Sequence, residues 1–157
     1  MKVGCERFLE YIEEQTYIEL TCSSCNSITT KELIEWCNEL GINKVDLASK
    51  LMIKDKLIDE GFTCLEFYNR FKHKAYGIHP SRFSNKFKVN SYQRKKMIET
   101  NFLDIAYYKK EEIFPNRFEK VPFINAEKYF QLTKEDIEIW RADNIKGYNM
   151  KQLKMDI

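Results

Sequence analysis

The sequence predicts a mostly helical protein, organised as a compact multi-helix domain. Helix-start signals recur along the chain, and apolar residues follow them at helical spacing. A length of 157 residues and a mass of 18.9 kDa suit one domain or two very small ones. A chain of this size can bury a sizeable core, so the helices are expected to pack against one another.

The N-terminal segment is expected to form an amphipathic helix, because Glu6–Glu14 carries apolar residues at helical intervals. Tyr17–Thr21 either continues this helix or forms a short strand. One short β element near the N-terminus is therefore part of the predicted fold. Cys22–Ser27 follows as a polar break.

Two further helices are predicted before residue 60. Thr29 followed by Glu32 is a capping-box signal, and it opens a helix that Gly41 can close in the left-handed conformation. Asn43 is then expected to cap a helix that runs towards Ile58.

The middle of the chain repeats the same signals. Thr63 with Glu66 is a second capping-box pattern, and Gly77 can end the helix that it opens. Pro80 suits the first turn of a short helix, since its missing N–H would be unpaired there. Two phenylalanines then fall on one face of that short helix, Phe83 and Phe87.

A longer helix is predicted from Tyr92 to about Lys110, because apolar residues recur along it at helical spacing. Glu111–Phe123 contains two prolines and is predicted to be a loop. This loop marks the expected boundary between a helical domain over residues 1–110 and a C-terminal helical extension over residues 111–157.

Two short helices are predicted within the C-terminal extension. Asn125 is expected to cap the first, which ends near Phe130. Thr133 with Asp136 is expected to cap the second, Lys134–Ile145.

Charge is distributed unevenly along the chain. The formal net charge is +2, yet Phe67–Ile98 holds nine Lys and Arg and no Asp or Glu. The remainder holds 17 basic residues against all 24 acidic ones, a net charge of −7. Such asymmetry is expected of a protein that binds a polyanion, because neutralising phosphates releases condensed counterions. A solvated basic helix face in a lysine-rich protein is the alternative explanation.

The cysteines and the apolar runs bear on location. Five cysteines, an odd number, fit poorly with a closed disulfide framework, so reduced thiols are expected. No stretch approaches the roughly 18–20 apolar residues of a membrane span, and the start lacks the apolar run of a signal peptide. We therefore expect a cytoplasmic protein without a membrane partner.

Cys22 and Cys25 form a C-x-x-C pair, which raises the question of zinc. A structural zinc site needs two further ligands, and no second C-x-x-C or H-x-x-x-H arrangement supplies them. We expect no metal site and no cofactor, with Cys22 and Cys25 as the candidate pair if zinc does bind.

One segment resembles the helix-turn-helix superfamily of DNA-binding proteins. In Leu33–Met52, apolar, small and glycine residues stand where that motif needs them: Trp36, Cys37, Leu40, Gly41, Ile42 and Leu47. The small residue lets two helices approach, glycine permits the turn, and the apolar residues hold the second helix at a steep angle. The second helix offers poor DNA chemistry, because Asp46 would face the phosphates. Its other exposed positions are Asn43, Lys44, Ser49 and Lys50.

A second match to the same motif lies inside the basic segment, at Arg70–Lys88. Its turn and core positions are Tyr76, Gly77, Ile78, Phe83 and Phe87. His73 departs from the pattern, because that position usually holds a small residue, which puts the helix crossing or the register in doubt.

The resemblance implies that the second helix of this match reads DNA. Arg can pair with guanine and Asn with adenine in the major groove, while Ser and Lys fix the register on phosphates. The start of the next helix, Gln93–Lys96, would contact the flanking backbone. The candidate nucleic-acid-binding residues are Arg70, Lys72, Lys74, Ser81, Arg82, Ser84, Asn85, Lys86, Lys88, Gln93, Arg94, Lys95 and Lys96.

The function predicted from these features is sequence-specific binding of double-stranded DNA, as a regulator or accessory protein of a phage or mobile element. The abundance of Lys, Ile, Asn, Tyr and Phe suits the AT-rich coding genome of a phage or a low-GC bacterium. The alternative is a small inhibitor or adaptor, for example a phage-encoded inhibitor of a host nuclease, that binds a protein or nucleoprotein through the basic surface. RNA is a third partner to consider. The oligomeric state stays open.

Catalysis is not expected. His79 and Arg82 have the H-x-x-R spacing of tyrosine recombinases, with Tyr107 or Tyr108 downstream, but the rest of that catalytic set is missing. The chain also lacks a Gly-rich phosphate loop and a G-x-S-x-G motif.

Overall fold

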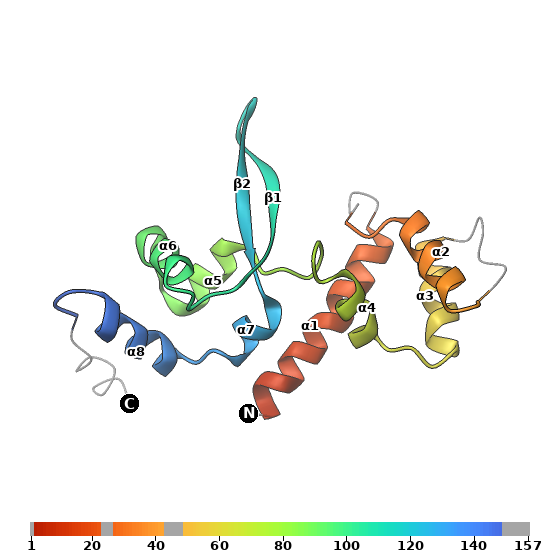
Figure 1. The fold of residues 1–157 in the computed structure, drawn as a ribbon, viewed down its shortest axis with the longest axis horizontal. Coiled ribbons are helices and arrows are strands. Elements are labelled where there is room, and N and C mark those ends of the chain that lie inside the picture. The colour runs from red at the N-terminus through yellow and green to blue at the C-terminus, as the bar shows by residue number, and fades with distance from the viewer. Residues whose placement is uncertain (1, 23–26, 43–48, 149–157) are drawn as a thin grey trace. The chain divides into compact units, whose positions relative to one another are not determined.

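The structure is a computed structural model that describes residues 2–22, 27–42 and 49–148. Within these ranges the chain forms eight helices and one two-stranded antiparallel sheet, so the prediction of a mostly helical fold is confirmed (Figure 1). None of the described helices is long and apolar enough to cross a membrane. The chain divides into two compact units between Gly77 and Ile78, here called the N-terminal unit and the C-terminal unit.

The N-terminal unit consists of four helices around an aromatic core. Its helices are α1 (Lys2–Thr21), α2 (Thr30–Glu39), α3 (Lys50–Asp59) and α4 (Cys64–Phe71). The Trp36 ring lies edge-on to the Phe67 and Phe71 rings of α4, with centroids 5.0 and 5.9 Å away. These contacts hold α2 against α4, because edge-to-face pairs add to the stabilisation from burial.

The prediction of a β element near the N-terminus is wrong. Tyr17–Thr21 belongs to α1, which continues because Ile12, Thr16 and Leu20 form one buried stripe at four-residue spacing. The sheet lies in the C-terminal unit instead.

Local signals in the N-terminal unit are partly confirmed. Thr29 and Glu32 form the predicted capping box, and Gly41 takes a left-handed conformation with φ of +77°. The predicted cap Asn43 lies outside the described residues, and the N-cap of α3 is Ser49, whose hydroxyl accepts from the Met52 N–H. Thr63 occupies the N-cap of α4, but its side chain makes no capping hydrogen bond.

The left-handed residue after α4 is Tyr76 rather than the predicted Gly77. Its φ is +70°, a conformation that costs a non-glycine residue about 1–2 kcal/mol. The buried Tyr76 hydroxyl lies 2.8 Å from the Thr16 hydroxyl, and its carbonyl accepts a 2.8 Å hydrogen bond from the Tyr11 hydroxyl. Burial raises the pKa of Tyr76, so the phenol stays protonated. These contacts offset the backbone cost.

The C-terminal unit places a β-hairpin between two pairs of helices. Its elements are α5 (Pro80–Phe87), α6 (Ser91–Glu99), β1 (Ile105–Phe114), β2 (Arg117–Ile124), α7 (Ala126–Gln131) and α8 (Lys134–Asn144). An isolated bridge between Ile78 and Ile124 ties the start of the unit to the end of β2. Pro80 opens α5, and Phe83 and Phe87 are buried, as predicted.

The predicted helix Tyr92–Lys110 and the predicted loop Glu111–Phe123 are both wrong. The helix ends at Glu99, and Asn101 follows with φ of +62°, which turns the chain into β1. The supposed loop belongs to the β1–β2 hairpin, whose turn holds Pro115 and Asn116. Pro122 is tolerated within β2 because the sheet has two strands, so one edge of each needs no ladder partner.

The predicted boundary between residues 110 and 111 falls inside β1. A division there would break the ladder that pairs β1 with β2, whereas the two compact units of the chain divide after Gly77. Further along the chain the predicted caps are confirmed. Asn125 caps α7, and Thr133 and Asp136 form a capping box for α8.

Candidate nucleic-acid interface

Helices α5 and α6 follow each other within the C-terminal unit and are joined by a short turn. His79 caps α5, because its Nδ1 accepts a hydrogen bond from the Ser81 N–H at 3.1 Å. Lys88 ends α5 with φ of +56°, and Asn90 caps α6 by accepting from the Gln93 N–H at 2.8 Å. Three residues, Lys88–Asn90, therefore turn the chain between the two helices.

The polar side of this pair faces solvent. Phe83, Phe87 and Met97 are buried, which anchors the inner faces of both helices in the core of the unit. The predicted site residues that are exposed lie on the other side: Ser81, Arg82, Asn85, Lys88 and Lys95. Tyr92, on the first turn of α6, is 65% exposed beside them.

Arg94 is the most constrained cation of the pair. Its Nη1 donates a 2.6 Å hydrogen bond to the Ser84 hydroxyl, which joins α6 to α5. Partial burial lowers the pKa of Arg94, but a guanidinium starts so high that it stays charged. The charge is thus held in place and partly stripped of water before any ligand binds.

Carboxylates do not neutralise this group of cations. Over residues 2–22, 27–42 and 49–148, no Asp or Glu forms an ion pair with Lys88, Arg94, Lys95 or Lys96. A set of cations without internal counter-ions suits an anionic partner, because binding need not first break ion pairs.

Two further cations of α5 lie over the aromatic rings of α7. Lys86 Nζ is 4.4 Å from the centroid of the Tyr129 ring, and Arg82 Cζ is 5.5 Å from it. Phe130 flanks both cations at 5.5 and 5.9 Å. Such cation–π contacts orient the two side chains.

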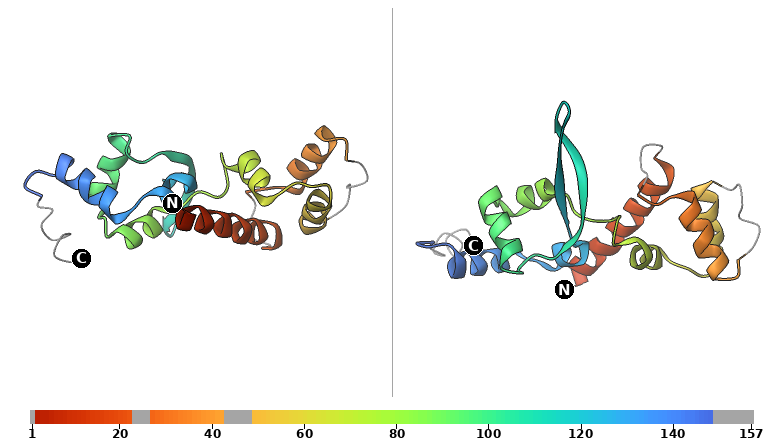
Figure 2. Two further views of the ribbon diagram at one scale, coloured as in Figure 1. Left: turned by 90° about the horizontal axis from the view of Figure 1, so that it is seen from below. Right: turned by 45° about the horizontal axis from the view of Figure 1, so that its top comes forward.

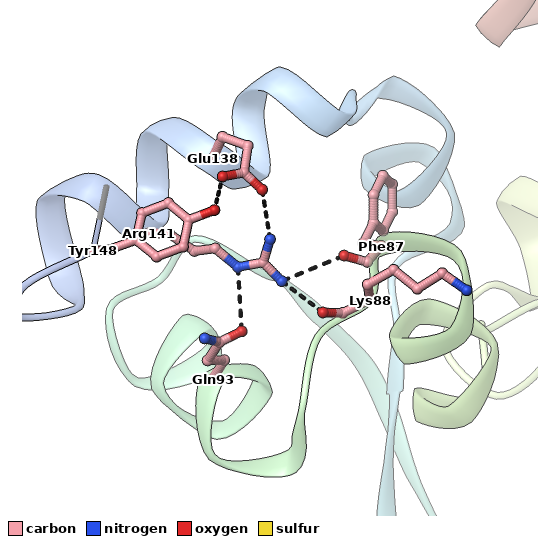
Figure 3. A network of polar contacts seen from close by, with 6 residues as sticks. All are labelled: Phe87, Lys88, Gln93, Glu138, Arg141 and Tyr148. Carbon is pink, nitrogen blue, oxygen red and sulfur yellow. Dashed lines mark hydrogen bonds and ion pairs between the residues drawn. The ribbon is translucent and has the colours of Figure 1, made fainter. Parts of the chain in front are cut away.

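Gln93 and Lys96 also serve the fold. The Arg141 guanidinium of α8 donates from Nε to Gln93 Oε1 at 3.3 Å and from Nη2 to the Lys88 carbonyl at 2.6 Å (Figure 3). Lys96 Nζ donates to the Asn144 carbonyl at 2.8 Å. These bonds fasten α8 to the α5–α6 pair, so two of the predicted site residues have structural partners.

Sequence reasoning missed Arg141, although a signal existed. Arg141 follows Ile137 by four residues and Trp140 by one, so it falls on the buried face of α8. Its Nη1 forms a 2.6 Å ion pair with Glu138, which also accepts from the Tyr148 hydroxyl (Figure 3). A charged residue on an apolar face is usually paired, as this one is.

The three remaining site residues belong to the N-terminal unit. Arg70 Nη2 pairs with Glu39 at 2.8 Å, and Lys74 pairs with Glu32. Lys72 is exposed, with Nζ 5.9 Å from the Tyr68 ring centroid. The basic segment Phe67–Ile98 is therefore split between two units, and two of its cations are matched by acids of α2.

Neither of the two segments that match the helix-turn-helix motif forms a fully described helix pair within a single unit. The match at Arg70–Lys88 draws on α4 and α5, which belong to different units. The match at Leu33–Met52 includes residues 43–48, which lie outside the described ranges, and Ser49 caps α3. In the folded chain, α5 and α6 are the helix pair with a short turn inside the basic segment.

Charge separates at the unit boundary. Residues 1–77 hold 10 Lys and Arg against 13 acids, a net charge of −3, whereas residues 78–157 hold 16 against 11, a net charge of +5. The C-terminal unit is thus the basic one.

The candidate zinc pair is only half described, because Cys25 lies outside the described ranges and Cys22 is half-buried. No group of three or more potential metal ligands gathers among the described residues.

Comparison of the chain with known protein families, curated proteins and solved structures finds no significant match. The function is therefore inferred from the side chains of the site.

Proposed function

We propose that the C-terminal unit binds double-stranded DNA through the α5–α6 pair, used as a helix-turn-helix whose second helix is α6. The observation that carries this proposal is a cluster of cations at the turn after α5 and on α6, Lys88, Arg94 and Lys95, without carboxylate partners in the described chain. A duplex supplies closely spaced phosphates along a groove wide enough for a helix.

The side chains divide naturally into two roles. Lys88 and Lys95 are exposed and suit phosphates, which position the protein without reading sequence. Asn85 and Arg94 have the bidentate donors and acceptors that distinguish adenine and guanine edges. Ser84 fixes the Arg94 guanidinium, which lowers the entropy lost on binding.

The match at Arg70–Lys88 draws on α4 and α5, whereas the proposed helix-turn-helix consists of α5 and α6. Arg70 and Lys74 then contribute to the N-terminal unit through their ion pairs, rather than to the DNA contact. They serve as matched controls, because they carry the same charges on the same chain.

The test is a titration of a labelled duplex of random sequence at several salt concentrations. Lys95→Gln is expected to weaken binding and to reduce the slope of log K against log salt by about one, whereas Arg94→Gln is expected to weaken binding through the loss of a base contact. Lys74→Gln and Arg70→Gln should leave the slope unchanged. Equal slopes for all four variants would reject the α5–α6 interface.

Selection of tight-binding duplexes from a random pool separates this function from its alternative. A sequence reader keeps a preference among duplexes as salt rises, whereas an inhibitor or adaptor shows sequence-blind binding that disappears. Loss of all enrichment at physiological salt would favour a protein or nucleoprotein partner.

A further inference from the structure

The β1–β2 hairpin carries a second surface that its own unit leaves uncovered. From Lys109 to Lys120 every residue is exposed except Glu111, which is half-buried. The hairpin extends away from the helices of the C-terminal unit in Figure 1 and in the right view of Figure 2. Neither face of its outer half therefore packs in the core, although it carries large apolar side chains.

On two adjacent rungs the ladder pairs like charges, two lysines on one face of the hairpin and two glutamates on the other. Lys110 lies directly opposite Lys120, and on the next rung Glu111 lies opposite Glu119. Because side chains alternate across a strand, the lysine pair lies on one face and the glutamate pair on the other. Like charges directly opposite each other destabilise a hairpin, so an isolated sheet would not select either pair.

The acidic pair is compensated within the unit, and the lysine pair is not. Glu111 accepts from His79 Nε2 at 2.9 Å, and Glu119 lies 3.8 Å from Arg117. Throughout the described ranges, neither Lys110 nor Lys120 forms an ion pair with a carboxylate. Glu112, on the same face as the lysine pair, instead accepts a 3.2 Å hydrogen bond from the Asn116 N–H. An external anion would relieve the repulsion between Lys110 and Lys120.

Exposed aromatic rings accompany the two lysines. Tyr108 is 60% exposed opposite Pro122, and Phe118 is 49% exposed opposite Glu112, both on the lysine face. Lys110 Nζ lies 4.9 Å from the centroid of the Phe118 ring. Cations interleaved with solvent-facing rings fit a partner that offers both phosphates and flat apolar surfaces.

We infer that the Tyr108–Lys110–Phe118–Lys120 face of the hairpin is a second DNA contact, in which the lysines bind backbone phosphates and the rings pack against sugars or bases. A two-stranded ribbon is narrow enough to enter a major groove. The inference rests on the proposed function, since it assigns the hairpin to the same DNA that α5 and α6 bind.

The test uses the full chain and the labelled duplex of random sequence, with Lys110→Gln/Lys120→Gln as the main variant. Loss of two phosphate contacts should lower the salt slope by about two and weaken binding on the order of tenfold or more. Lys109→Gln is the matched control, because Lys109 is exposed and adjacent but lies on the glutamate face. It should leave slope and affinity unchanged.

The variant Tyr108→Ala/Phe118→Ala tests the contribution of the aromatic rings to binding separately from that of the lysine charges. This variant should weaken binding while the salt slope stays the same, because no phosphate contact is lost. Thermal unfolding of each variant checks the fold, and removal of the lysine repulsion should leave the lysine variant at least as stable as the wild type.

The outcomes distinguish the two proposals. If Lys95→Gln weakens binding and the lysine variant behaves like Lys109→Gln, the hairpin contact is rejected and the α5–α6 interface stands. If the lysine variant weakens binding and Lys95→Gln and Arg94→Gln do not, the hairpin contact stands and the α5–α6 interface is rejected. An unaltered protein that fails to bind the duplex at low salt rejects both.

Discussion

The backbone of Lys88 ends α5 and accepts a hydrogen bond, whereas its side chain is exposed. Its φ of +56° closes α5, and its carbonyl accepts a hydrogen bond from Arg141. This conformation costs a lysine residue about 1–2 kcal/mol, and glycine or asparagine would adopt it more readily. The exposed ammonium meanwhile has no carboxylate partner in the described chain.

Replacement of Lys88 by Asn should therefore separate stability from binding. We expect the free energy of unfolding to change by less than about 1 kcal/mol, because Asn tolerates the left-handed region. DNA affinity should fall, and the salt slope should drop by about one, because a phosphate contact is lost. Urea unfolding and the duplex titration measure the two effects. Lys88→Gly should behave alike, and unchanged binding in both variants would remove Lys88 from the interface.

Helix α8 acts as a support for the α5–α6 pair. Arg141 is 9% exposed and contacts the turn between the two helices, while Trp140 Nε1 donates a 3.1 Å hydrogen bond to the Thr100 hydroxyl after α6. Removing one partner of a buried ion pair leaves the other without compensation, and this is more costly than loss of an exposed pair. Arg141 is therefore expected to be the main polar anchor of α8.

Truncation of Arg141 to Ala is expected to destabilise the C-terminal unit by about 3 kcal/mol, since Glu138 and the Lys88 carbonyl lose their donor. Trp140 fluorescence during urea unfolding, in a Trp36→Phe background, reports on this unit alone. Lys134→Ala is the control, because Lys134 is an exposed residue of the same helix. An equal unfolding midpoint for the two variants would show that Arg141 does not anchor α8.

At the scale of the whole molecule, two units of opposite net charge each carry one tryptophan, Trp36 and Trp140. In the N-terminal unit, the ionisation of the Glu32 carboxyl affects the stability of the folded state. Partial burial raises the pKa of its carboxyl, but hydrogen bonds from Lys74 and Thr29 outweigh burial, and the pKa lies below its ordinary value. A carboxyl with a depressed pKa in the folded state stabilises that state at neutral pH, and the stabilisation is lost as pH falls through that pKa.

Glu32→Gln should therefore reduce the stability of the N-terminal unit at neutral pH and make it less sensitive to acid. Urea unfolding followed by Trp36 fluorescence, in a Trp140→Phe background, compares the two proteins at about pH 7 and about pH 3. The difference between them should shrink at the lower pH. DNA binding by the C-terminal unit should not change. A difference that is the same at both pH values would contradict the role of the Glu32 carboxylate.

The sequence alone determined the features that depend on residues within one helical turn. The Thr29–Glu32 and Thr133–Asp136 capping boxes join residues three apart, and Pro80 needs only the first turn of α5. Such signals act through local hydrogen bonds and backbone angles, so they do not require the rest of the fold. The mostly helical class and the buried faces of these helices follow from the same local rules.

Tertiary structure decided where distant segments meet. Ile105–Lys110 has apolar spacing compatible with a helix, and its pairing with β2 made it part of a strand. The charges of Arg70 and Lys74 look available along the chain, until folding brings the carboxylates of Glu39 and Glu32 to them from α2. These outcomes depend on pairings between residues from 10 to 42 positions apart, and a local sequence pattern does not contain the energies of such pairings. Tertiary structure thereby separated the cations matched within the protein from Lys88, Arg94, Lys95, Lys110 and Lys120, which have no carboxylate partner in the described chain.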